Sequence, residues 1–180
     1  MNDDFLRKMQ EVNKSMKAAS EIFQWFMKRG LDDPTNSKIG HTKIQKLLFL
    51  AWLIHFQKFE KSLFSDDFFA FPNGEVAIPA YYEYKDNYTK LSQKPLPEFD
   101  TEELETLRLT EEIFGDASYE ELIALGHNSP AWQKYISQSA QEHDINPYAP
   151  RPRIPKEELT EELTMIETVL FAYENMCNDS

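Results

Sequence analysis

Several features that are common in proteins are scarce in this sequence of 180 residues. Its single cysteine, Cys177, excludes an intramolecular disulfide and a zinc site built from cysteines. Its five glycines count against a nucleotide-binding fold with several glycine-rich turns. The longest apolar run, residues 47–54, is too short to span a bilayer, and the acidic start lacks the apolar segment of a signal peptide. We therefore expect a soluble, cytoplasmic protein with no membrane partner.

Positive charge is also scarce. The chain has 19 Lys and Arg against 31 Asp and Glu, which gives a net charge of −12. Residues 91–180 carry most of the excess, with 6 basic and 19 acidic residues. Direct nucleic-acid binding is not expected, because phosphate contacts require an excess of cations. The acidic residues either keep the surface soluble or form a face that attracts a basic partner.

The residues that are abundant predict one mainly α-helical domain. Hydrophobic residues make up 41% and aromatic residues 13% of the chain, enough for a single packed core. The sequence predicts helices over 15–29, 41–59 and 156–176, and a further helix that begins at Pro79. It also predicts an acidic helix that is capped by Asp100 or Thr101 and stops at Gly115, and a short helix over 119–126 that Ser118 caps, with Glu121 placed as in a capping box. We expect an N-terminal extension over 1–14, a compact helical domain over 15–140, and a proline-rich connection with a C-terminal helix over 141–180 that packs on the same domain.

One short antiparallel β-hairpin interrupts the helical pattern. The apolar segments FFAF and EVAI flank Pro72, Asn73 and Gly74, which predicts a hairpin over residues 68–78. Gly74 is expected to adopt a positive φ, because only glycine does so at little cost.

Residues for catalysis or metal binding do not form a recognisable set. No two histidines lie three or four residues apart, and His55, on an apolar face, is expected to be a core residue. The sequence has no nucleophile elbow and no phosphate-binding loop. The glutamate pairs 102/103 and 161/162 are expected on exposed helix faces. Carboxylates there are solvated, whereas a catalytic acid needs burial to raise its pKa. We therefore expect neither an enzyme nor a bound cofactor or metal. An enzyme that lacks a recognisable motif remains an alternative.

Three ordered segments carry a more specific pattern. The residues that match it are Lys43, Gln45, Lys46 and Leu47, then Phe71, Pro72, Asn73, Gly74, Val76, Pro79 and Tyr82, then His127, Pro130 and Trp132. Together they resemble the Panacea domain family, which includes SocA-like antitoxins and phage-associated GepA-like proteins. The sequence departs from the family pattern where Phe71 replaces a tryptophan, Glu75 a proline and Gly126 a threonine.

This resemblance implies a helical domain with a small hairpin. It also implies a non-enzymatic antitoxin that neutralises a cognate protein toxin by direct binding, and SocA-like members also deliver the toxin to a protease. A phage or prophage protein that inhibits or redirects a host defence factor is the alternative within the binding class. The oligomeric state is left open between monomer and homodimer.

Aromatic and acidic residues are the candidates for contact with a protein partner. Trp25 and Trp52 are expected in the core, and Trp132 is expected to be largely buried and to organise, with His127, the turn between two helices. Adjacent tyrosines cannot all point inward from one helix, so at least one is expected to be exposed. The partner-binding candidates are Tyr81, Tyr84, Glu102, Glu103 and Glu105.

Overall fold

The computed structural model describes residues 16–33, 35–145 and 149–179. The expected extension, residues 1–14, lies outside them. The elements are α2 (Ala19–Lys28), α3 (Ser37–Phe59), β1 (Asp67–Phe71), β2 (Gly74–Ile78), α4 (Ala80–Gln93), α5 (Thr101–Phe114), α6 (Tyr119–His127), α7 (Pro130–Ile145), β3 (Arg153–Ile154), the 3₁₀ turn η1 (Lys156–Glu158) and α8 (Thr160–Asn178). The expected mainly α fold with a short hairpin is confirmed.

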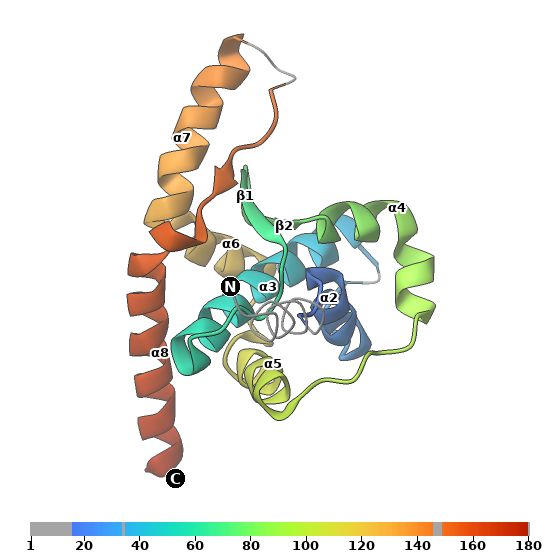
Figure 1. Ribbon diagram of the computed structural model, residues 1–180, viewed down its shortest axis with the longest axis vertical. Helices are drawn as coiled ribbons and strands as arrows, with labels where there is room; N and C mark the ends of the chain where they lie inside the picture. The colour runs from blue at the N-terminus through green and yellow to red at the C-terminus, as the bar shows by residue number, and fades with distance from the viewer. Residues whose placement is uncertain (1–15, 34, 146–148, 180) are drawn as a thin grey trace, which may run out of the picture.

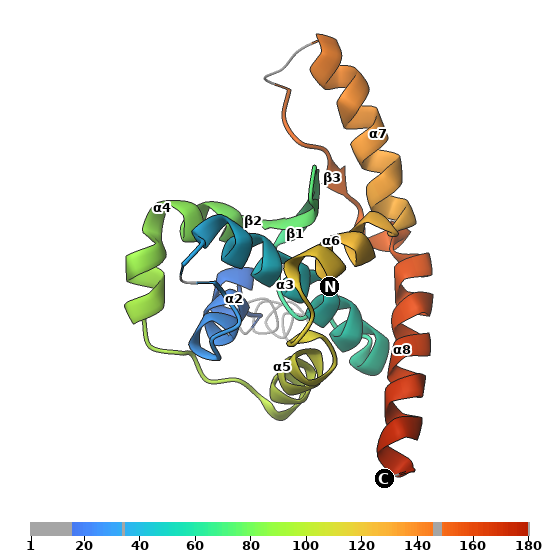
Figure 2. The same cartoon turned by 180° about the vertical axis from the view of Figure 1, so that it is seen from behind.

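Helix α3 forms the centre of the molecule. It packs against α2, α5, α6, α8 and β2, so its apolar side chains are buried on nearly every face (Figure 1). Seen from behind, α5 and α6 lie around it and α8 runs along one side (Figure 2). A helix that is apolar all round needs such an enclosure, because water would otherwise reach one of its faces. Its N-terminus begins earlier than expected, at Ser37, because the Asn36 side chain accepts a hydrogen bond from Ile39 N at 3.2 Å.

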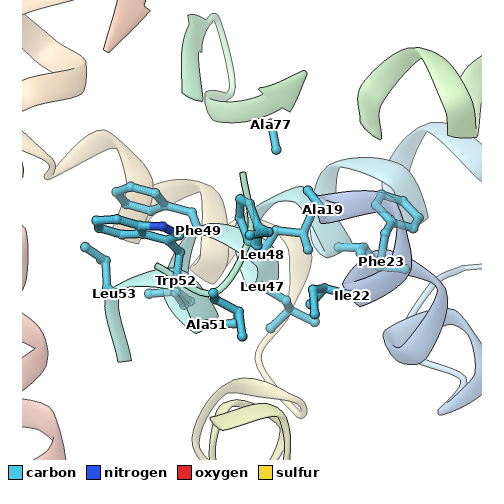
Figure 3. Close-up of a cluster of buried hydrophobic side chains, with 14 of the residues drawn as sticks. Ala19, Ile22, Phe23, Leu47, Leu48, Phe49, Ala51, Trp52, Leu53 and Ala77 are labelled. Carbon is cyan, nitrogen blue, oxygen red and sulfur yellow. The ribbon is translucent and has the colours of Figure 1, made fainter. Parts of the chain in front are cut away.

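The core gathers side chains from α3 around those of α2 and the sheet (Figure 3). Phe23 and Ile22 of α2 are fully buried, as are Leu47 and Leu48 of α3. The predictions that Trp25, Trp52 and His55 belong to the core are confirmed, because all three are buried. His55 is also satisfied, with its Nδ1 2.7 Å from Thr106 Oγ1.

The sheet has three antiparallel strands in the order β2-β1-β3, rather than the two of the expected hairpin. Strand β1 pairs with β2 through Phe71 opposite Gly74, and with β3 through Phe68 opposite Ile154. The prolines before Arg153 predict an extended segment, but they gave no sign that this segment would add to β1. Strand β2 is left as an edge strand.

Helix α2 begins at Ala19, so the expectation that it begins at residue 15 is wrong for the described residues 16–18. Lys17 instead forms a parallel bridge with Phe64. The Asp66 carboxylate fixes the helix start, because it accepts hydrogen bonds from Ala19 N at 2.9 Å and from Ala80 N at 3.3 Å. One buried side chain thus satisfies the first turns of both α2 and α4.

Helices α7 and α8 lie along one side of the molecule (Figures 1 and 2). Helix α7 projects beyond the sheet, whereas α8 runs in the other direction and packs against α3. None of the helices formed by the described residues has the length and apolar character that crossing a bilayer requires.

Candidate functional site

Two polar side chains of α3 bind the free edge of β2. Gln45 Oε1 accepts a hydrogen bond from Ala77 N at 2.8 Å, and Lys46 Nζ donates one to Glu75 O at 2.8 Å. Both side chains are buried. They replace the neighbouring strand that an edge strand lacks, which explains why polar residues stand on the most apolar helix of the chain.

The hairpin turn is held from its other side. Trp132 Nε1 donates to Phe71 O at 2.8 Å, and His127 Nε2 donates to Pro72 O at 3.1 Å. The two rings stack with centroids 4.5 Å apart. The prediction that Trp132 is largely buried is confirmed, and the two side chains attach the turn between α6 and α7 to the hairpin.

The other residues of the sequence pattern also have structural positions. Lys43 Nζ donates to Gly115 O at 3.1 Å, Leu47 and Val76 are buried, and Gly74 has the expected positive φ, +107°. Asn73 lies in the hairpin turn; Pro79 and Pro130 stand at the N-termini of α4 and α7. The structure therefore brings the three sequence segments together around the hairpin.

A cluster of buried ionisable groups lies at this junction. Lys46, Glu75 and Glu162 are 2%, 0% and 2% exposed. Lys46 Nζ lies 3.7 Å from Glu75 Oε2. Glu162 Oε1 accepts hydrogen bonds from Ser129 Oγ at 2.7 Å and from Ala131 N at 2.9 Å. The carboxylate of α8 thus holds the start of α7, far from it in sequence.

Burial shifts the proton affinities of two of these groups. It lowers the pKa of Lys46 to about 8, although the neighbouring Glu75 opposes the shift. Burial also raises the pKa of Glu75, where Lys46 acts in the opposite direction and the nearby Glu162 adds to the rise. Each shift favours the neutral form of its group, as expected where water cannot solvate a charge.

A pocket of about 290 Å³ opens beside this cluster, between α3, α6 and α8. Its walls are mostly apolar, and its polar lining residues are Lys46, Asn128, Ser129, Glu161 and Glu162. Within the described part of the chain, Glu162 Oε2 and both carboxyl oxygens of Glu75 are buried without a hydrogen-bond partner. An apolar pocket with a few convergent polar groups is the usual form of a site for a small ligand or an inserted side chain.

This cluster is not predicted from the sequence, and the expectation that Glu162 lies on an exposed helix face is wrong. A signal was present, because Glu162 lies three residues after Leu159 and four before Ile166, on the buried stripe of α8. Glu75 also stands out, as an acid within an apolar strand. Among the residues that the structure describes, no three His, Cys, Asp or Glu side chains are grouped so that they could hold a metal ion.

The tyrosines of α4 differ in their exposure. Tyr84 is buried, with its ring centroid 4.4 Å from that of His41, so the expectation of an exposed anchor at this position is wrong. Its hydroxyl donates to Ser37 O at 3.3 Å. Tyr81 is half-buried against His41 and Phe71. Tyr82 is 50% exposed, which confirms that at least one of the three faces solvent.

The three candidate glutamates of α5 are engaged within the protein. Glu103 is buried and accepts a hydrogen bond from Asp100 N at 2.9 Å, so its expected exposure is wrong. The ion pairs are Lys17–Glu103 at 3.6 Å, Lys61–Glu102 at 2.8 Å and Lys58–Glu105 at 2.9 Å. Basic residues of the first half of the chain lie beside α5 and pair with these three glutamates.

Comparison with known proteins identifies one family. The sequence model described as "Antitoxin SocA-like, Panacea domain" matches residues 44–133, half of the chain. The match includes β1, β2, α4, α5 and α6 and the start of α7, whereas α2 and α8 lie outside it. Curated proteins and solved structures give no match.

Proposed function

Because the chain belongs to the SocA-like antitoxin family with a Panacea domain, we propose that it neutralises a cognate protein toxin by direct binding. The family match is the observation that carries this proposal. The residues that resemble the family pattern hold the hairpin to α3 and α7, so most of them are not free to contact a partner. Recognition then depends on residues at the surface.

The outer face of α8 has the properties of such a surface. Phe171 is 66% exposed, a large exposed fraction for an aromatic side chain. Glu167 and Glu174 lie four residues before it and three after it, so all three residues share one side of the helix, and both glutamates are exposed. An exposed aromatic side chain between acidic ones fits a partner with an apolar recess bordered by Lys or Arg.

Co-expression tests the proposal. The protein encoded beside this gene is expressed alone and together with the wild-type chain, and growth is measured. We expect growth arrest by the neighbour alone, rescue by the wild-type chain, and a stable complex of the two purified proteins. A neighbour that is not toxic, or rescue without a complex, would contradict direct neutralisation.

Two variants then locate the contact surface. Phe171→Ala should weaken the complex at least tenfold, and Tyr82→Ala, which removes the exposed aromatic side chain of α4, is the matched control. Loss of binding in the control alone would place the surface on α4 instead. Replacing Glu167 and Glu174 by Gln should slow association and reduce its salt dependence, since charge acts mainly on encounter and is screened beyond about 8 Å at physiological salt.

Delivery of the toxin to a protease is a separate step, which the lifetime of the toxin in growing cells tests. We expect that lifetime to shorten when the wild-type chain is co-expressed, and to stay unchanged with Phe171→Ala. An equal lifetime with and without the chain would limit its role to binding.

A further inference from the structure

A second pocket, of about 310 Å³, lies between α3, the hairpin and the start of α4. Its volume is at the lower end of the roughly 300–1,000 Å³ typical of small-molecule sites. Three residues with rings, one from each element, line it: His41 of α3, Phe71 of β1 and Tyr81 of α4. The ring centroids of His41 and Phe71 lie 4.7 Å and 5.1 Å from that of Tyr81, so the rings form a continuous row.

This row of rings is an apolar wall that solvent reaches. Phe71 and Tyr81 are half-buried, so part of each side chain is accessible. Burial lowers the pKa of His41 to about 4, and the nearby Lys85 acts in the same direction. The imidazole is therefore neutral at neutral pH and adds no charge to the wall. A wall of this kind packs well against a flat ring.

Positive charge surrounds these rings. Lys38 lines the pocket and is exposed. Lys85 Nζ lies 6.0 Å from the ring centroid of Tyr81, and Arg151 Cζ lies 5.7 Å from that of Phe71. None of the three cations has an ion-pair partner in the described part of the chain. They come from α3, α4 and the segment before β3, so the fold gathers them around the rings from distant parts of the sequence.

Negative charge is scarce here, although the chain has 31 Asp and Glu. Among the described residues, no Asp or Glu lines this pocket. Glu75, next to the lining residue Val76, is fully buried, with its Oε2 3.7 Å from Lys46 Nζ. That carboxyl group therefore does not compensate the three cations. The pocket is a local exception to the net charge of −12, and an exception of this sign favours an anionic ligand.

Two neutral polar side chains, Thr42 and Asn73, also line the pocket. Both are half-buried, and neither side chain makes a hydrogen bond with another described residue. A threonine hydroxyl and an asparagine amide can both donate to an oxyanion. The pocket thus combines an apolar wall, free donors and an excess of positive charge, which is the form of a site for an anionic group attached to a ring.

We propose that this pocket binds a small aromatic anion, a free molecule in which a single ring carries a carboxylate or a phosphate group. The ring packs beside Tyr81 and Phe71, and the anionic group lies among Lys38, Lys85 and Arg151. The site is formed by α3, α4 and the hairpin and not by the outer face of α8. It therefore goes beyond the function proposed above and does not rest on it.

Titration of the full chain with four probes that share one ring tests the charge preference. Benzoate, phenyl phosphate, benzyl alcohol and benzylammonium are added to the ¹⁵N-labelled protein, and chemical shifts of residues around the pocket are followed by NMR. We expect at least one of the two anions to bind about tenfold more tightly than the alcohol, and the cation to bind most weakly. Equal binding of all four, or no binding of either anion, would overturn the proposal.

Variants of exposed lysines test the site itself. Lys38→Gln combined with Lys85→Gln removes two of the cations and should weaken binding of the tighter anion about tenfold. Lys28→Gln combined with Lys90→Gln removes two exposed lysines elsewhere and is the matched control, which should bind as the wild type does. Thr42→Phe keeps every charge and should abolish binding by filling the space. Wild-type affinity in the Lys38 and Lys85 variant, or an equal loss in its control, would refute the assignment.

Salt dependence provides an independent measurement. Added NaCl should weaken binding of the tighter anion, because ions screen exposed charges, and should leave binding of benzyl alcohol unchanged. An affinity for the anion that does not change with salt would contradict its placement among the three cations. Because the probes are added to the chain alone, a failure of the antitoxin proposal leaves this result intact.

Discussion

Gly74 is a position at which a single added methyl group should disrupt a buried hydrogen bond. Its φ is +107°, and a Cβ atom placed there would lie 2.2 Å from Lys46 Nζ and 3.0 Å from Lys46 Cε. If Lys46 were exposed to solvent, its ammonium group could move away from the added Cβ atom at little cost. Here the side chain of Lys46 is only 3% exposed and holds Glu75 O, so its displacement breaks a buried hydrogen bond.

Gly30 provides the matched control for Gly74→Ala. Its φ is also positive, +75°, but nothing lies within 4 Å of the position that its Cβ would take. Gly30→Ala should therefore cost only the left-handed backbone, about 1–2 kcal/mol. Gly74→Ala adds the loss of a hydrogen bond from a charged donor to backbone strain, so we expect about 3–6 kcal/mol.

Urea unfolding followed by tryptophan fluorescence measures both variants, since Trp25, Trp52 and Trp132 are all buried in the native state. The variants are also made in a Lys46→Met background, where the added cost at Gly74 should shrink while that at Gly30 stays the same. Equal costs for Gly30→Ala and Gly74→Ala, or an unchanged cost at Gly74 without the lysine, would refute the role given to Lys46.

Three further predictions follow from the same contacts. Trp132→Ala should destabilise the protein by about 3–5 kcal/mol in thermal or urea unfolding, because it empties a buried site and removes the hydrogen bond to Phe71 O; a variant that folds normally but loses its partner would show that Trp132 is an interface residue. The pKa of Lys46 is about 8 in the folded chain against an ordinary 10.5, so between these pH values the unfolded chain binds more protons. The free energy of unfolding should therefore rise with pH across this window relative to Lys46→Met, and parallel pH profiles of the two proteins would contradict the shift. With a net charge of −12, the protein should not shift duplex DNA in a gel at micromolar concentration and physiological salt, and a shift removed by competitor DNA would disprove this.

Patterns that depend on neighbours in sequence predicted much of the fold. Ser118 with Glu121, and Asp100 before α5, form the capping arrangements that their spacing indicates. The turn at Gly74 was predicted for the same reason, since its chemistry lies within a few residues. These features need no information about the rest of the chain.

Features that join distant segments were not predicted. Asp66 binds two helix starts, and Glu162 binds the turn before α7, but nothing near either residue in sequence indicates those partners. Glu75 and Gly126 are distant in sequence, but the sequence marks both of them, because each departs from the family pattern. A Cβ at position 126 would lie 3.3 Å from Glu75 Oε2, so the two departures are in contact across the hairpin and α6.

The attachment of Gln45 and Lys46 to β2 also bears on self-association. An unprotected edge strand offers outward N–H and C=O groups on which the strand of another chain can pair, which is a common start of aggregation. Here Ala77 N and Glu75 O are already occupied by helix side chains. The opposite edge, β3, has only two residues, Arg153 and Ile154. The sheet therefore offers few free backbone groups to which a strand of another chain could add. Gln45 and Lys46, two polar side chains on an apolar helix, thus also disfavour non-native self-association.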